Sequence, residues 1–109
     1  MTKTIALNGR LPHYVANLGY IYGKSGNKGD AQKMLDELHL RAKTEFVSPY
    51  DFALVYVALG DKEKTFEMLE EAIRKRVIGT HAGLRLDPSW DGLRSDPRFA
   101  ELMQRAELP

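Results

Sequence analysis

An internal repeat with a period of 34 residues constrains this chain more than any other feature of its sequence. Between residues 12–45 and 46–79, identical residues coincide at that period in six pairs, namely Tyr22 with Tyr56, Gly26 with Gly60, Lys28 with Lys62, Met34 with Met68, Leu35 with Leu69 and Glu37 with Glu71. A repeat of this length indicates one supersecondary unit that buries its apolar face by stacking on the next copy. The two copies span residues 12–45 and 46–79.

Within each copy the apolar residues have the spacing of two helices joined by a tight turn. The turn contains Gly26 in the first copy and Gly60 in the second, and glycine suits the left-handed backbone that ends many helices. The predicted buried faces of the first copy are Val15, Leu18, Ile21 and Tyr22, then Ala31, Met34, Leu35, Leu38 and Ala42. Those of the second copy are Phe52, Ala53, Tyr56 and Leu59, then Phe66, Leu69, Ala72 and Ile73.

Residues 52–59 are apolar at all eight positions, and such a run would also suit a buried strand. The repeat favours a helix instead. Because a helix that is apolar all round packs on more than one side, we expect this segment to be an inner helix that lies between its neighbours.

The last segment, residues 80–109, predicts a degenerate third unit that caps the array. Two Asp-Pro pairs, at 87–88 and 96–97, each provide an N-cap residue followed by proline at the first helical position. The first of these prolines also excludes a long first helix in this unit. We expect a short helical turn over 88–93 and a capping helix over 97–106, with a buried face of Phe99, Leu102 and Met103.

These residues resemble the tetratricopeptide repeat, a helical hairpin of 34 residues with the pattern Trp-x2-Leu-Gly-x2-Tyr, Ala-x3-Phe and a closing Pro. The first copy reads Val15-x2-Leu18-Gly19-x2-Tyr22 and Ala31-x3-Leu35, and the second reads Pro49-x2-Phe52-Ala53-x2-Tyr56 and Thr65-x3-Leu69. The departures are Thr65 at the alanine position, and Lys43 and Val77 at the position of the closing proline. The resemblance implies one all-α domain over residues 1–109, with two regular helix-turn-helix units, a degenerate capping unit, and residues 1–11 as a remnant or capping segment.

The stretch from Ser48 to Gly60 and the two Asp-Pro pairs also resemble the C-terminal tetratricopeptide region of bacterial multidomain regulators, such as winged-helix transcription factors and class III adenylate cyclases. This resemblance implies a regulatory or scaffolding module cut from a longer chain. Ile5, Ala6 and Leu7 would then be the end of a preceding helix.

Composition excludes several classes of function. The chain has no cysteine, so it has no disulfide, thiolate metal site or cysteine nucleophile. Sixteen Lys and Arg against fifteen Asp and Glu leave a net charge of +1, without the basic excess that nucleic-acid binding requires. The apolar run at residues 5–7 is too short for a signal peptide or a membrane span. We expect a soluble cytoplasmic protein with no nucleic-acid or membrane partner.

The stretch YGKSGNKGD, residues 22–30, suggests a phosphate-binding loop at first sight. The first glycine of such a loop is replaced by Leu18, and an amphipathic helix precedes the stretch in place of a strand, so an interhelical turn is the better interpretation. No metal site is expected from His13, His39 and His81, which are far apart, or from Asp87, Asp91 and Asp96, which Pro88 and Trp90 interrupt. We therefore expect no cofactor and no enzyme activity, and a nucleotide or small-ligand site at Lys24 is the alternative.

The remaining candidate site is the concave surface that the first helix of each pair lines in tetratricopeptide arrays. The helical phase places nine residues there: His13, Ala16, Asn17, Tyr20, Lys24, Tyr50, Asp51, Leu54 and Val57. The resemblance implies a non-catalytic module that binds a peptide or partner protein on this surface. Since only Asn17 and Lys24 would suit a clamp for a C-terminal carboxylate, we expect an extended or helical apolar segment as the guest. Two alternatives stay open, packing of these residues on a neighbouring repeat and self-association as a homodimer.

Overall fold

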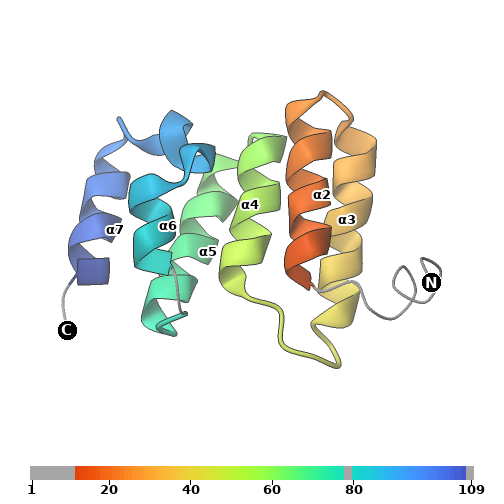
Figure 1. The fold of residues 1–109 in the computed structure, drawn as a ribbon, viewed down its shortest axis with the longest axis horizontal. Coiled ribbons are helices and arrows are strands. Elements are labelled where there is room, and N and C mark those ends of the chain that lie inside the picture. The colour runs from red at the N-terminus through yellow and green to blue at the C-terminus, as the bar shows by residue number, and fades with distance from the viewer. Residues whose placement is uncertain (1–11, 78–79, 108–109) are drawn as a thin grey trace.

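The computed structural model describes residues 12–77 and 80–107, and its regular structure is helical (Figure 1). The helices are α2 (Pro12–Lys24), α3 (Lys28–Arg41), α4 (Pro49–Leu59), α5 (Lys62–Arg74), α6 (Thr80–Leu86), the 3-10 helix η2 (Pro88–Leu93) and α7 (Pro97–Glu107). Within these ranges there is no strand, which confirms the all-α class. The expectation for residues 1–11 lies outside the described residues.

The helices stand side by side in one array. α2 and α3 form a hairpin, α4 and α5 form the next, and α6, η2 and α7 follow at the C-terminal end (Figure 1). α2 packs most extensively on α4 and α3, and α4 packs most extensively on α2 and α5. In the described ranges no helix is long and apolar enough to cross a membrane.

The two predicted turns have the same geometry. Gly26 and Gly60 have φ angles of +89° and +86°, in the left-handed region that favours glycine. After each glycine the next amide closes the helix end, since Asn27 N donates to Tyr22 O at 2.8 Å and Asp61 N donates to Tyr56 O at 3.0 Å. The architectural interpretation of both glycines is confirmed.

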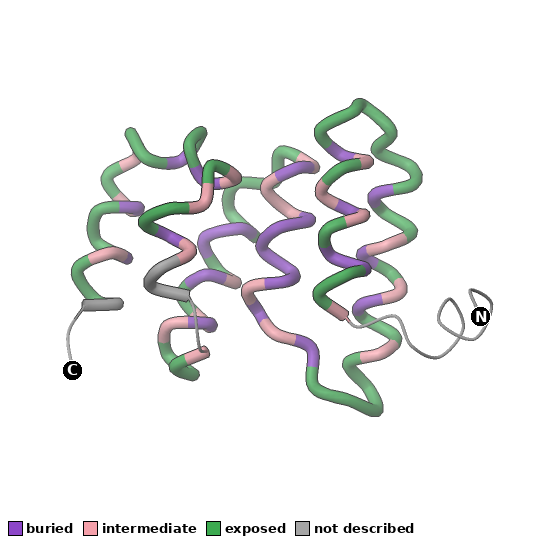
Figure 2. Tube along the Cα trace, in the orientation of Figure 1, coloured by how far each residue is buried: buried purple, intermediate pink, exposed green. Residues whose placement is uncertain are grey.

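α4 is the inner helix of the array. It packs on α2, α3, α5 and η2, and Figure 2 shows it buried along most of its length. Its buried residues are Pro49, Asp51, Phe52, Ala53, Leu54, Val55 and Ala58. The prediction that residues 52–59 form a helix packed on several sides is therefore confirmed.

Two glycines on α2 permit its close approach to α4. A Cβ atom at Gly23 would lie 2.6 Å from the Cβ of Ala58, and one at Gly19 would lie 2.9 Å from Cγ2 of Val55. Both distances are shorter than a van der Waals contact, so a larger residue at either position would push the two helices apart.

The helices η2 and α7 of the C-terminal cap lie within one residue of the predicted boundaries. Asp87 Oδ1 accepts a hydrogen bond from Ser89 N at 2.9 Å, and Asp96 Oδ1 accepts one from Arg98 N at 2.9 Å, as N-cap residues do. Phe99 and Leu102 are buried, and Met103 is half-buried against the core. The helix α6 was not predicted, and it is a shortened first helix that ends before Pro88.

The predicted buried faces are wrong at two positions. Ile21 is 56% exposed, and Ala42 is exposed because it follows the last residue of α3. Thr65, the departure from the alanine pattern, is fully buried, and its hydroxyl donates to Asp61 O at 2.7 Å. The extra polar group is thus hydrogen-bonded within its own helix.

Candidate functional site

The α2 part of the predicted surface lies open to solvent. His13, Asn17 and Lys24 are exposed and Tyr20 is half-buried. The Lys24 ammonium group lies 6.0 Å from the centre of the Tyr20 ring, at the outer limit of a cation–π contact. These four residues, here called the α2 strip, present an aromatic ring, an amide and a cation on one side of the helix.

The α4 part of the predicted surface is largely closed. Leu54 is 3% exposed, and Ala16 on α2 is fully buried, so neither side chain lines an open groove. Tyr50 and Val57 are half-buried and pack against the core. The prediction of an open groove that includes Ala16 and Leu54 is corrected, because both side chains are buried where α2 and α4 approach closely.

Asp51 is also buried, and it joins the two helices that were predicted to line the groove. Its side chain is 8% exposed, and its Oδ1 lies 2.8 Å from Nδ1 of His13. Burial raises the pKa of the Asp51 carboxyl, and the hydrogen bond with His13 partly offsets that rise. The carboxylate therefore serves as a contact between α2 and α4 and is not accessible to a ligand.

Tyr50 forms a polar contact that the sequence interpretation missed. Trp90 Nε1 donates to the Tyr50 hydroxyl oxygen at 3.0 Å, and the Tyr50 hydroxyl donates to Asp87 Oδ2 at 3.2 Å. The two rings meet edge to face, with centroids 5.4 Å apart. Burial, followed by the negative charge of Asp87, raises the pKa of Tyr50 to about 12. Tyr50 thus links α4 to the C-terminal unit.

Gly83 and Arg94 complete this link. A Cβ atom at Gly83 would overlap the Tyr50 hydroxyl group, so only glycine leaves room for the ring. The Arg94 guanidinium donates to the carbonyl oxygens of Leu84 at 2.7 Å and Asp87 at 3.0 Å. The one signal in the sequence was the period, which places Trp90 at the position of Tyr22 and Tyr56.

Three backbone amides of the glycine-rich stretch 22–30, those of residues 25–27, are engaged within the turn. Ser25 N donates to Ile21 O at 3.0 Å, and Gly26 N donates to Gly23 O at 3.2 Å. The Ser25 hydroxyl also donates to Ile21 O, at 2.7 Å. A phosphate cradle needs amides that point at the anion, and here these donors serve the end of α2.

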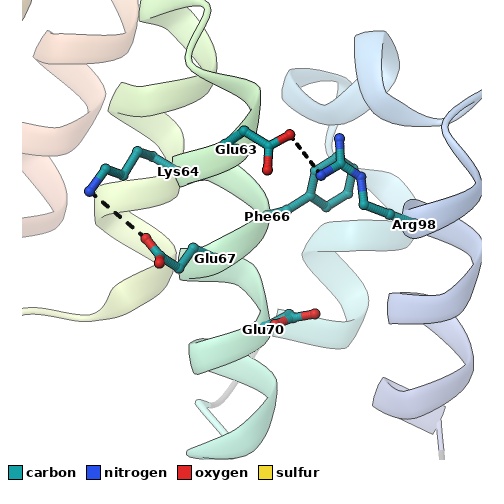
Figure 3. A pocket seen from close by; sticks show the side chains of 6 residues that line it. All are labelled: Glu63, Lys64, Phe66, Glu67, Glu70 and Arg98. Carbon is teal, nitrogen blue, oxygen red and sulfur yellow. Dashed lines mark hydrogen bonds and ion pairs between the residues drawn. The ribbon is translucent and has the colours of Figure 1, made fainter.

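A crevice of about 350 Å³ lies between α5 and α7 (Figure 3). The residues that line it are Glu63, Lys64, Phe66, Glu67, Glu70 and Arg98. The Arg98 guanidinium covers the Phe66 ring at 4.4 Å from its centre and donates to Glu63 Oε2 at 3.0 Å. It also donates to Asp96 and lowers the pKa of that carboxyl to about 2. Arg98 therefore fastens α7 to α5.

The acidic groups along the crevice are paired as well. Glu67 lies 4.0 Å from Lys64, and Glu70 accepts from Arg105 of α7 at 3.2 Å. Glu71 of α5 pairs with Arg74 in the last turn of the helix and with Lys75, its C-cap residue. We interpret this region as a salt-bridged seam between helices.

No metal centre is formed by the described part of the chain, where no group of three or more His, Cys, Asp or Glu side chains converges. His13 contacts Asp51, and the His39 ring lies 4.8 Å from the Phe52 ring. The side chain of His81 lies outside the described residues.

Comparison with known proteins gives no relative. No protein-family model matches the chain, and no curated protein or solved structure matches it at a significant level.

Proposed function

We propose that this chain is a non-catalytic interaction module of the tetratricopeptide type that binds a peptide or partner protein along the α2 strip. The observation that carries the proposal is the pair of hairpins, closed by the same left-handed glycine turn one period apart and packed side by side. Arrays of stacked hairpins use their extended lateral surface for binding.

The chemistry of the α2 strip indicates what it would bind. The Asn17 amide suits the backbone of an extended segment, and the half-buried Tyr20 ring offers an apolar contact. Lys24 adds a positive charge, whereas the neighbouring carboxylate of Asp51 is buried and paired with His13. We therefore propose a largely apolar guest segment, extended or helical, that carries an acidic group near Lys24.

Peptide display tests the proposal. The full chain is used to select peptides from a random library, and the dissociation constants of selected peptides are measured by fluorescence anisotropy. We expect Tyr20→Ala combined with Lys24→Ala to weaken binding at least tenfold. Gln32→Ala, an exposed change on α3, is the matched control and should leave binding unchanged. Equal binding by all three proteins would show that the surface is wrong. Tyr50 is left intact because it holds the C-terminal unit.

The nucleotide alternative is tested with the same proteins. A site occupied at a hundredfold excess of ligand over its dissociation constant would stabilise the fold by about 2.7 kcal/mol. We expect no thermal shift with millimolar magnesium ATP, since the amides of residues 25–27 donate to carbonyl oxygens of α2. A shift that Lys24→Ala abolishes would favour the nucleotide site over the interaction module.

A further inference from the structure

The side of α2 that faces away from α4 is apolar. Tyr14 is 53% exposed and Ile21 is 56% exposed, with the half-buried Leu18 between them. These residues are spaced by four and three positions, so they share one face of the helix. The buried residues of α2 are Val15, Ala16, Gly19 and Gly23, and the two glycines lie against Val55 and Ala58 of α4.

This face of α2 carries no charged side chain. Over its length of 13 residues α2 has no acidic residue, and its only Lys or Arg is Lys24 in the last turn, which belongs to the α2 strip. The outer surface of α7, at the other end of the array, is polar, with Arg98, Glu101 and Gln104 beside Pro97 and Ala100. The two ends of the array therefore differ in chemistry.

We propose that the Tyr14–Leu18–Ile21 face binds a second copy of this chain, with the two α2 helices antiparallel across a two-fold axis. An isologous contact places the same surface on both sides, so a neutral apolar face is compatible with itself. A head-to-tail contact would instead bury the charged Arg98 and Glu101 of one copy against apolar side chains of the next, and taking charges out of water is costly. The difference between the two ends favours a closed dimer over an open chain of copies.

The geometry of the face sets the register. In an antiparallel pair centred between residues 17 and 18, Tyr14 of one copy meets Ile21 of the other and the two Leu18 side chains lie near the axis. A helix of 13 residues is about 20 Å long. One such face provides less than the ~800 Å² per partner of a standard interface. We therefore expect a weak dimer, with a dissociation constant in the micromolar range or above.

The first test is sedimentation equilibrium on the full chain at concentrations up to about 500 μM. These concentrations cover the dissociation constants expected of a small interface. The wild-type chain should approach the mass of two chains, and Ile21→Glu should weaken association at least tenfold. Leu86→Glu is the matched control, because Leu86 is also an exposed apolar residue, at 77%, but lies at the end of α6. Circular dichroism verifies that each variant is folded.

Cysteine cross-linking tests the register of the two helices. Because each disulfide traps the complex covalently, the cross-linked product builds up even when the dimer is weak. The natural chain has no cysteine, so each disulfide reports an introduced site. A mixture of Tyr14→Cys and Ile21→Cys chains should form the mixed disulfide at least five times more than either homodimer, and Leu86→Cys should form little. A monomer at every concentration, a dimer that Ile21→Glu leaves intact, or cross-linking equal to that of Leu86→Cys would overturn the proposal.

Discussion

Two of the interfaces of α4, toward α2 and toward the C-terminal unit, are built from different chemistry. Toward α2 the helices are joined by close backbone approach, with Gly19 and Gly23 set against Val55 and Ala58. Toward the C-terminal unit the contact depends on directional hydrogen bonds, in which the Tyr50 hydroxyl contacts Trp90 and Asp87. The α2–α4 interface depends mainly on close packing, with one polar contact between His13 and Asp51. At the C-terminal unit, polar groups fix the position of Trp90 against α4.

Trp90→Ala should give the largest loss at the polar interface. The Trp90 side chain is fully buried and also donates to Tyr50. Removal of such a side chain lowers the free energy of unfolding by about 3–5 kcal/mol. Urea unfolding followed by circular dichroism measures the change, and Leu86→Ala, at an exposed position of α6, is the control. A loss below about 1 kcal/mol would mean that η2 does not belong to the core.

Gly23→Ala should break the apolar interface. The added methyl group would meet the Ala58 side chain and backbone, and overpacking of this kind costs about 1–3 kcal/mol. The same change at Gly29 on α3 meets nothing within 4 Å. There the better helix propensity of alanine should stabilise the protein by about 0.5–1 kcal/mol. Urea unfolding measures the free energy of unfolding of both variants. A decrease for Gly23→Ala with an increase for Gly29→Ala would confirm the role of Gly23, and changes of the same sign would contradict it.

The sequence predicted the regular part of the fold better than the candidate site. The 34-residue period identified the turns at Gly26 and Gly60, and the Asp-Pro pairs located η2 and α7. The contact between Tyr50 and Trp90 joins residues 40 positions apart in the sequence. Trp90 lies in the C-terminal segment, which does not follow the regular repeat, so the sequence spacing did not predict that the two side chains meet. Helical phase gives the direction of a side chain but not how closely the neighbouring helices approach, which is why Leu54 was assigned to an open groove.

Tyr50→Phe separates the hydrogen bonds of the polar interface from its packing. The change leaves the Trp90 donor without the Tyr50 oxygen, and one buried unsatisfied group costs about 1–3 kcal/mol. The wild-type pKa of about 12 lies above the ordinary value of 10.0, so the folded state holds this proton more tightly than the unfolded chain. The contribution of this proton to the free energy of unfolding is complete below pH 10 and is lost as the pH rises from 10 to about 12. Urea unfolding across this range should show a smaller alkaline loss for Tyr50→Phe, and an identical loss would contradict the assignment.

Asp51→Asn should give the smallest effect, and it tests the polar contact within the interface between α2 and α4. Burial raises the pKa of Asp51, so the folded state binds this proton more tightly than the unfolded chain does. The stability associated with that proton is present below the ordinary value of 3.8 and is lost as the pH rises through the folded pKa.

At pH 7 the buried carboxylate is therefore less favourable than a neutral amide, which can still hydrogen-bond His13. We expect Asp51→Asn to be slightly more stable than the wild type at pH 7, with the difference shrinking as the pH is lowered toward 3.8. His13→Ala should act in the opposite direction at pH 7, because it leaves the carboxylate without its partner. If Asp51→Asn instead destabilises the protein at pH 7 as much as His13→Ala does, the contact between Asp51 and His13 contributes more than the burial of the carboxylate costs, and the interface is less apolar in character than its glycines indicate.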